Sequence, residues 1–451
     1  MIIEAKTSKI YHAMRKMFVL LIINNLSLRS IISKTYMKMI NRFLLCLIAF
    51  GVINIGHSQN NNNLSVSQIT GAPNYLNVIT TAVPFLTIAP DARAGGMGDA
   101  GVATSADANS IHWNPAKLAF ADKEMGVGIS YTPWLRALVP DINLAYLSFY
   151  KKFNDQQALA VSLLYFSLGN INFTGNTGED LGSFNPNEFS IDLAYSRKLS
   201  DDFSAGVALR YIYSNLTGNF SVSGAQTHPG TAAAADLSAY YHHEVDWGGK
   251  GSIFTAGVDI SNIGSKMSYT NTGYSDFIPT QIKIGPALKM KLDEYNTLCI
   301  TVDFNKLLVP TPPIYLTDSN GAPVINSVTN TQELKAGHNP NVSVPQGMIQ
   351  SFYDAPGGFS EQMKEWDIAS GIEYWYDKQF ALRAGYFYEP VSKGGRQFFT
   401  VGAGLKYSVF GLDFAYLIPT AQRNPLENTL RFTLLFDFDT AKNKDSKDAA
   451  N

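Results

Sequence analysis

Glycines at a fixed spacing are the first residues of this chain that could do chemistry, in the run Gly96-Met-Gly98-Asp-Ala-Gly101. The spacing matches the dinucleotide-binding fingerprint, in which glycines let the backbone approach a pyrophosphate at the start of a helix. That fingerprint belongs between a strand and a helix, and neither neighbour is indicated here. The surrounding residues 91–121 are instead rich in Ala, Gly and Asp. We therefore expect a compact, irregular plug, and we predict no cofactor.

A second candidate is a metal site at His242-His243-Glu244. Adjacent side chains on a strand point to opposite faces, so the two imidazoles cannot grip one ion without a bend in the strand. A solvated strand end is the better interpretation. No Gly-x-Ser-x-Gly nucleophile elbow occurs, and the seven histidines are scattered, so no nucleophile and base are arranged for catalysis. We predict no catalytic residue, no metal ligand and no enzymatic activity.

The composition favours a surface that meets lipid. Charged residues make up 16% of the 451 positions, below the soluble average of about 25%, and 23 Tyr and 27 Phe make the aromatic content high. After Gln59 no uninterrupted apolar run reaches the roughly 18 residues of a helical membrane span, which leaves a membrane barrel as the alternative. The net charge of −2 gives no basic footprint for nucleic acid. Cys46 falls in a predicted signal peptide, so Cys299 has no disulfide partner.

An export signal begins inside the sequence rather than at residue 1. The basic run Met37-Lys-Met-Ile-Asn-Arg42 is followed by an apolar segment and then by Gly-His-Ser-Gln59. This is the basic, apolar and small-polar order of a secretory signal peptide. We predict the signal peptide at 37–59, and we interpret 1–36 as an over-long start or an extension.

Period-two alternation dominates the chain from about Glu124 to Phe438, in runs of roughly ten residues. A tilted strand needs about that length to cross a bilayer. We therefore predict an all-β fold: a transmembrane antiparallel β-barrel of about 14 strands at 123–438, after an N-terminal periplasmic hatch at 60–122 and before a polar periplasmic tail at 439–451. The expected strands lie at 124–132, 141–152, 156–168, 187–199, 203–215, 231–242, 251–260, 278–292, 296–306, 366–376, 380–389, 396–409, 412–418 and 428–438.

Short and long connections alternate along the predicted barrel. Short turns belong to the periplasmic side of such barrels, so we expect the long loops outside and, with an even number of strands, both termini in the periplasm. The loop 307–365 is too long to be a mere connection. The short connections are expected at 152–155, 200–202, 293–295, 377–379 and 410–411, and the other long ones at 133–140, 169–186, 216–230, 261–277 and 419–427.

Hairpins that keep their apolar residues on one face also fix which residues oppose each other. This argument places Asp192 opposite Arg210. It likewise places Glu373 opposite Arg383. Both predicted ion pairs lie on the polar face, which must be the lumen, because Arg or Lys facing lipid costs about 2–4 kcal/mol at mid-bilayer. The same parity assigns to the lumen Asp259, Lys283, Lys289, Asp303, Arg396, Lys406, Asp413 and Arg431, and to lipid Ile282, Ile284, Leu288, Ile300, Val302, Leu412, Phe414, Phe432 and Phe436.

The first long loop carries an apolar segment bounded by prolines, Pro133-Trp134-Leu-Arg-Ala-Leu138-Val-Pro140. Exposed apolar loops usually mark a contact with another molecule. Folding back onto the barrel rim, or into the outer leaflet, is an equally good interpretation. The candidate contact residues are Trp134, Leu135, Leu138 and Val139.

Two runs resemble the N-terminal signature of the PorV family of type IX secretion, Ala89-Pro-Asp-Ala-Arg93-Ala-Gly-Gly-Met-Gly-Asp-Ala-Gly101-Val-Ala and Asp107-Ala-Asn-Ser-Ile-His-Trp-Asn114-Pro115-Ala. The second is also similar, more distantly, to the hatch of FadL-type channels for hydrophobic compounds, whose barrels have fourteen strands. The resemblance covers roughly residues 70–438. The hatch residues that the resemblance identifies are Arg93, Gly95, Gly96, Gly98, Gly101, Asn114 and Pro115.

The resemblance implies a non-enzymatic shuttle in the outer membrane. Such a protein would dock beside a SprA-type translocon, receive secreted proteins through their C-terminal signal domains, and pass them to a PorU-type sortase for attachment at the cell surface. Two alternatives stay open. A FadL-like channel would need an apolar path through the lumen, and an enzyme that deacylates lipopolysaccharide would need a nucleophile and base at the outer rim.

Overall fold

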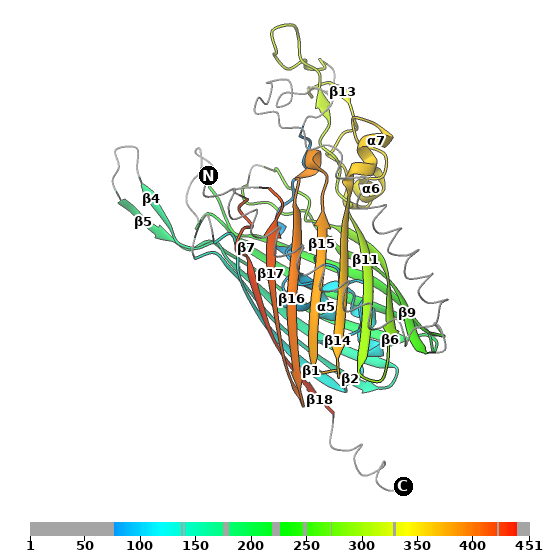
Figure 1. Cartoon of the computed structure of the whole chain (residues 1–451). Coiled ribbons are helices and arrows are strands. Elements are labelled where there is room, and N and C mark those ends of the chain that lie inside the picture. Colours follow the sequence, from blue (N-terminus) through cyan, green and yellow to red (C-terminus); the bar gives the residue numbers. More distant parts are fainter. Residues whose placement is uncertain are drawn as a thin grey trace, which may run out of the picture. The chain divides into compact units, whose positions relative to one another are not determined.

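The computed structural model describes residues 76–136, 139, 141–174, 180–218, 226–246, 250–271, 273–327, 331–421 and 424–439. The predicted signal peptide, the segment 1–36, Leu138 and all but the first residue of the predicted polar tail lie outside the described residues. Fourteen strands of the described chain close into one antiparallel barrel, in which each strand pairs with its neighbours along the chain and the first pairs with the last (Figure 1). The predicted fold class is confirmed.

The barrel strands occur where the alternation predicts them, with ends that differ by a few residues. They are β1 Met125–Pro133, β2 Asn143–Asn154, β3 Gln157–Ser167, β6 Asn187–Lys198, β7 Phe203–Asn215, β8 Gly230–Asp246, β9 Gly251–Gly264, β10 Gln281–Lys291, β11 Asn296–Leu307, β14 Trp366–Tyr376, β15 Phe380–Tyr388, β16 Gln397–Tyr407, β17 Phe410–Pro419 and β18 Leu430–Phe438.

The two faces of the barrel wall differ in polarity, as period two requires. On β6, Ile191 and Leu193 are each 47% exposed on the outside, while Ser190 and Asp192 are buried on the inside. The same sorting holds on the other strands, which present Leu209, Leu237, Ile372, Leu382, Val401, Leu405 and Phe432 on the outside. An apolar band outside a polar interior is the construction of a transmembrane β-barrel. Among the described residues, no helix is long and apolar enough to span a membrane.

Connections differ sharply between the two ends of the barrel. At the short-turn end, strands are joined by a few residues, as at 155–156, 292–295 and 377–379. At the long-loop end, the connections are larger and hold structure of their own. The connection between β3 and β6 forms a separate hairpin, β4 Ile171–Thr174 with β5 Asp180–Phe184.

The longest connection, residues 308–365, is called the cap below. It contains the short pair β12 Ile314–Tyr315 and β13 Leu334–Ala336, then α6 Val344–Gln350, α7 Phe359–Gln362 and η4 Met363–Glu365. The neighbouring loop between β15 and β16 carries one further turn, η5 Val391–Lys393. Figure 1 shows β13, α6 and α7 together beyond the long-loop end of the strands.

The described part of the hatch, residues 76–122, fills the barrel lumen. Its short elements are η2 Pro84–Thr87, α4 Ala92–Gly95, α5 Ser110–Trp113 and η3 Pro115–Phe120. Buried side chains of the hatch, among them Phe85, Met97, Ile111 and Leu118, pack against inward residues of the wall.

The path of the hatch runs from one end of the barrel to the other. At the long-loop end, the Asn77 amide donates to the Ser392 carbonyl at 2.8 Å, and the Ala82 amide donates to the Phe277 carbonyl at 2.9 Å. At the short-turn end, Tyr150 donates its hydroxyl proton to the Lys123 carbonyl at 3.2 Å, just before β1 begins. The expectation of a periplasmic N-terminus concerns residues outside the described part. The described chain itself starts at the long-loop end, because the hatch crosses the lumen before the first strand.

Candidate functional site

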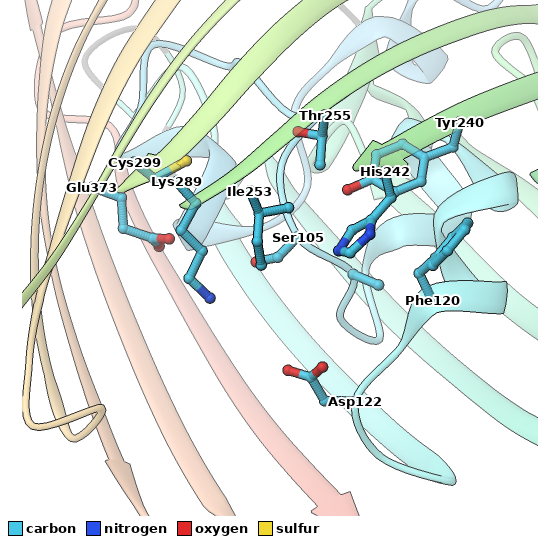
Figure 2. Close-up of a pocket in the computed structure, with 11 residues that line it drawn as sticks. Ser105, Phe120, Asp122, Tyr240, His242, Ile253, Thr255, Lys289, Cys299 and Glu373 are labelled. Atoms are coloured by element: carbon cyan, nitrogen blue, oxygen red, sulfur yellow. The ribbon is translucent and has the colours of Figure 1, made fainter. Parts of the chain in front are cut away.

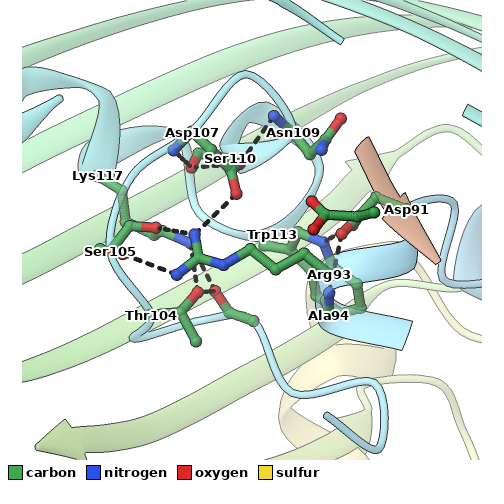
Figure 3. A network of polar contacts seen from close by, with 12 residues as sticks. Asp91, Arg93, Ala94, Thr104, Ser105, Asp107, Asn109, Ser110, Trp113 and Lys117 are labelled. Carbon is green, nitrogen blue, oxygen red and sulfur yellow. Dashed lines mark hydrogen bonds and ion pairs between the residues drawn. The ribbon is translucent and has the colours of Figure 1, made fainter. Parts of the chain in front are cut away.

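Arg93 is the hub of the polar contacts that hold the hatch. Its guanidinium is buried and donates to both carboxylate oxygens of Glu373 on β14, each at 2.9 Å. It also donates to Asp107 at 2.9 Å, to the Ser105 carbonyl at 3.0 Å and to the Ser105 hydroxyl at 2.8 Å. Figure 3 shows the side chain extending from α4 toward Ser105 and Asp107. Bidentate pairing with a carboxylate suits the planar guanidinium, so Arg93 both folds the hatch and fastens it to the wall.

Asp91 begins α4 by accepting the Ala94 amide at 2.9 Å, the usual role of a helix N-cap. Its second oxygen accepts the indole N–H of Trp113 at 2.6 Å, which ties α4 to α5. Burial raises the pKa of Asp91 to about 6, and repulsion from Asp107 adds to the shift.

The glycines of the fingerprint-like run serve close contact with the wall rather than with a ligand. Gly98 has φ of 69° and lies against the backbone of β15. A Cβ on Gly385 would lie 2.1 Å from the Gly98 nitrogen, so both the hatch and β15 need glycine where they cross. Added side chains at Gly95, Gly96 and Gly101 would meet Arg431, Gly402 and Trp113 respectively. The wall and the rest of the hatch therefore occupy the space that a pyrophosphate would need.

A wall carboxylate receives the end of this run. Asp303 on β11 accepts the amides of Gly101 at 2.7 Å and Val102 at 2.8 Å. Nearby, Arg431 on β18 donates to Asp99 at 2.6 Å. Wall residues far along the sequence thus satisfy the polar groups of a segment that has little regular structure.

Asn114 and Pro115 start η3. The Asn114 side chain accepts the Ala116 amide at 3.0 Å and donates to the carbonyls of Val102 at 3.1 Å and Ala239 at 3.0 Å. It therefore caps the turn and joins it to both the hatch and β8. Pro115 occupies the first position of the turn, where its missing N–H costs nothing.

Lys117 lies in the same turn and is fully buried. Its ammonium donates to the Gly101 carbonyl at 2.7 Å and to the Thr104 hydroxyl at 3.1 Å. Burial lowers the pKa of Lys117 to about 8.

One predicted lumen pair belongs wholly to the wall. The strand register sets Asp192 opposite Arg210, and the side chains meet at 2.5 Å. Arg210 also pairs with Asp236 on β8 at 3.0 Å and donates to the Asn262 side chain. Asp236 lies on the next strand, and no hairpin argument between β6 and β7 points to it.

The other predicted lumen pair is shared between wall and hatch. Glu373 lies opposite Arg383 in the register and accepts its Nε–H at 2.8 Å. Arg383 continues to Asp413 on β17 at 2.6 Å. Because Glu373 also holds Arg93, the strand pair predicted from parity is the point at which the hatch is fastened.

A small cavity opens between the hatch and the wall and has a volume of about 60 Å³. Binding sites for small molecules usually measure about 300–1,000 Å³, so this space suits a few waters. Figure 2 shows Lys289 and Glu373 at one side, with His242 and Phe120 at the other. Cys299 also lines it and is a buried, free thiol.

The adjacent histidines of β8 point away from each other. The His242 ring stacks on Phe120 with centroids 4.9 Å apart, whereas His243 pairs with Asp202 at 2.9 Å on the exposed side. Among the described residues, no three His, Cys, Asp or Glu side chains gather where they could hold a metal ion.

The cap is held to the barrel by a buried charge network that the sequence did not point to. Lys306, the next-to-last residue of β11, pairs with Glu365 at 2.6 Å. Glu365 also accepts the Thr311 hydroxyl at 2.7 Å and pairs with Lys393 of η5 at 3.0 Å. Lys393 in turn pairs with Glu361 of α7 at 2.7 Å. These contacts join the cap, β11 and the loop between β15 and β16.

Apolar side chains are more exposed on the cap than at the described positions of the first long loop. Trp134 and Leu135 are half-buried and pack against the core, and Val139 is 37% exposed. The cap and the neighbouring η5 leave much larger apolar areas uncovered, at Ile349, Phe352, Tyr353, Phe359, Met363 and Val391, of which Phe359 is 80% exposed. Exposed apolar side chains gathered in this way mark surfaces that meet other molecules.

The fold and the filled lumen define a transmembrane β-barrel whose interior is closed by its own N-terminal segment. The family model for type IX secretion system protein PorV matches residues 72–314, and the chain belongs to this family. That match covers all of the described hatch and the barrel as far as the first strand of the cap.

Solved barrels are similar at low identity. The Pseudomonas putida toluene transporter TodX is 11% identical with a TM-score of 0.42, over 76% of this chain and 95% of that one. The Ralstonia pickettii toluene transporter TbuX is 10% identical with a TM-score of 0.42, over 77% and 98%. A Pseudomonas aeruginosa FadL homologue is 11% identical with a TM-score of 0.40, over 80% and 100%. The comparison with curated protein sequences finds no match.

Proposed function

We propose that this protein is an outer-membrane shuttle of the type IX secretion system. It binds secreted proteins through their C-terminal signal domains at a SprA-type translocon and delivers them to a PorU-type sortase for surface attachment. The observation that carries the proposal is the family match over residues 72–314. In an outer-membrane barrel, the long loops would lie at the cell surface and the short turns in the periplasm.

The filled lumen supports a role in holding partners over a role in conducting solutes. The hatch fastens to the wall through Arg93 and Glu373, and the cavity beside it is small. A FadL-like channel would need an apolar passage through this charged interior. A lipopolysaccharide deacylase would need a nucleophile and base at the rim.

Partner contact is expected at the long-loop end. The cap presents Phe359 and Met363 to solvent, one turn apart on the same side of α7 and η4. Trp134, Leu135, Leu138 and Val139 of the first long loop remain candidates for contact with translocon or cargo. The half-buried positions of Trp134 and Leu135 make the cap the stronger candidate.

A deletion strain tests the function most directly. Loss of the shuttle should leave type IX cargo in the periplasm, and the wild-type gene should restore secretion. Lost uptake of hydrophobic compounds with normal secretion would instead identify a channel. Altered lipid acylation with normal secretion would identify a lipid-modifying enzyme.

Capture of the tagged protein tests the contact surface. The double variant Phe359→Asp with Met363→Asp should reduce co-purification of translocon and cargo at least tenfold, a loss of about 1.4 kcal/mol. Lys364→Asp is the matched control, because it changes the charge by the same amount at the exposed position that directly follows Met363. Trp134→Asp with Leu138→Asp tests the first loop in the same assay. Undiminished capture by both double variants, with folded barrels, would remove both surfaces from consideration.

A further inference from the structure

The first described residues connect the cap, at the long-loop end, with the hatch inside the lumen. Residues 76–83 are called the strap below. They run from the cap at the long-loop end to η2 inside the lumen. Contacts with the cap hold the outer end of the strap. Contacts inside the lumen hold its inner end.

Asn77 anchors the outer end. Its backbone N–H donates to Ser392 in η5 at 2.8 Å, and its side chain donates to Glu361 of α7 at 2.9 Å and to the Pro312 carbonyl at 3.2 Å. Asn77 is buried, at 7% exposure, although Leu76 beside it is 63% exposed. Glu361 is also the partner of Lys393. The strap is therefore part of the charge network that holds the cap.

Phe85, in η2 directly after the strap, anchors its inner end. Its ring stacks on Phe166 of β3, with centroids 6.2 Å apart and planes 2° from parallel. Phe85 and Val83 are each only 1% exposed. Further along the hatch, Asp91 and Arg93 fix the chain to α5 and to the wall. The inner end thus cannot shift without disturbing the plug.

Val83, between the two anchors, has a strained backbone. It adopts φ of 46° and ψ of 51°, in the left-handed region, although it is β-branched. It also precedes Pro84, and the residue before proline disfavours helical backbone angles. Such a conformation persists only where the surroundings over-determine it. Here the surroundings are the two anchors and the hydrogen bond from the neighbouring Ala82 amide to the Phe277 carbonyl, at 2.9 Å.

We propose that the strap couples the cap to the hatch, so that displacement of the cap relaxes Val83 and loosens the hatch, and unseating of the hatch loosens the cap. This goes beyond the proposed function, because the coupling is a property of the chain whichever molecule the cap binds. Thermodynamic linkage requires it to act equally in both directions. A partner that moves the cap would therefore alter the seal of the lumen from outside.

Hydrogen–deuterium exchange of the purified full chain in detergent tests the coupling. Asn77→Ala removes two side-chain hydrogen bonds at the outer anchor, and we expect amides of residues 84–100 to exchange about tenfold faster. Asn143→Ala is the matched control, because within the described part of the chain its side chain donates to the nearby Asp141 carbonyl and to no residue of the strap. It should leave exchange of residues 84–100 unchanged.

A double-mutant cycle with Val83→Gly isolates the strain. Glycine adopts the left-handed region freely, and the cycle cancels the packing lost with the valine side chain. In the Val83→Gly background, Asn77→Ala should speed exchange of residues 84–100 by less than about threefold. In the reverse direction, Asp99→Asn, which weakens the Arg431 contact inside the lumen, should speed exchange of the cap residues 344–365.

The results that would overturn the proposal are distinct. Faster exchange in the cap of Asn77→Ala, with residues 84–100 unchanged, would separate the two regions. An effect of Asn77→Ala that is the same in both backgrounds would remove Val83 from the mechanism. Equal acceleration in the barrel strands would mean general destabilisation. None of these outcomes depends on whether the protein carries cargo.

Discussion

The hatch and the cap are both irregular segments held by buried charges, yet their large apolar side chains differ in exposure to solvent. In the hatch, Phe85, Met97 and Leu118 are almost fully buried against the wall. In the cap, Phe359 is 80% exposed and Met363 is 53% exposed. Ion pairs fix each segment in place, but the cap buries few apolar side chains, such as Leu308 and Val309, and leaves large ones exposed. The comparison supports a sealing role for the hatch and is consistent with the partner contact proposed for the cap.

The largest effect should come from Glu373→Gln. This change leaves Arg93 and Arg383 without their shared carboxylate, and breaking a buried pair costs about 3–5 kcal/mol. The barrel should unfold at lower denaturant concentration, and the loosened hatch should let ions through in planar bilayers. Asp192→Asn is the matched control, since it breaks a lumen pair that does not touch the hatch. It should destabilise the protein without raising conductance. Equal conductance in the two variants would contradict the role of Glu373 as the hatch fastening.

A pH effect is expected in the hatch because its folded state binds a proton that an exposed Asp would release. Burial raises the pKa of Asp91 from 3.8 to about 6. The protonated folded state is therefore favoured below pH 3.8, and this stabilisation is lost as the pH rises toward 6. The loss is on the order of 3 kcal/mol across that range. It should appear as a fall in the denaturation midpoint between pH 4 and 6 that is smaller in Asp91→Asn. A midpoint that rises over this range in the wild type alone would reverse the sign and refute the assignment.

Gly385→Ala should disturb the hatch through contact alone. The added Cβ would lie 2.1 Å from the Gly98 nitrogen, so one of the two backbones must move. Overpacking of this kind costs about 1–3 kcal/mol. Gly251→Ala is the control, because a Cβ there meets nothing within 4 Å. Denaturation of both variants measures the difference. Equal stability would mean that the hatch yields at this crossing.

The smallest effect on stability should come from the cap surface. Phe359→Ser removes an exposed side chain, and such changes usually alter the free energy of unfolding by less than about 0.5 kcal/mol. Thermal denaturation should therefore show no clear shift, although partner capture falls. A loss of more than 1 kcal/mol would mean that Phe359 supports the cap itself, and the contrast between the two segments would weaken.

The barrel could be predicted from the sequence because its order repeats every two residues. Alternation locates each strand, and a short turn then sets the register, which is why Asp192 falls opposite Arg210. The Ala- and Gly-rich hatch has no such period. Its contacts join residues far apart, as Arg93 and Glu373 are 280 positions apart, so composition indicated a plug without indicating what holds it.

The charge network that holds the cap could not be predicted, for the same reason. Lys306, Glu365 and Lys393 lie on three separate segments, and no local pattern marks them as one network. The direction of the hatch was hidden too. An even number of strands predicts that β1 starts at the short-turn end. It does not constrain the path of the irregular segment that precedes β1.

The seam between β1 and β18 sets an order on folding. It pairs Met125 with Phe438 and Tyr131 with Phe432, so the two ends of the barrel sequence must meet before the ring is complete. Contacts between such distant residues form late, since closing a long loop is slow and entropically costly. The hatch is synthesised first and ends up inside the ring. The last pairing step is therefore also the step that encloses it, and a chain stalled before Leu430 would present an open strand edge and an unshielded hatch at once.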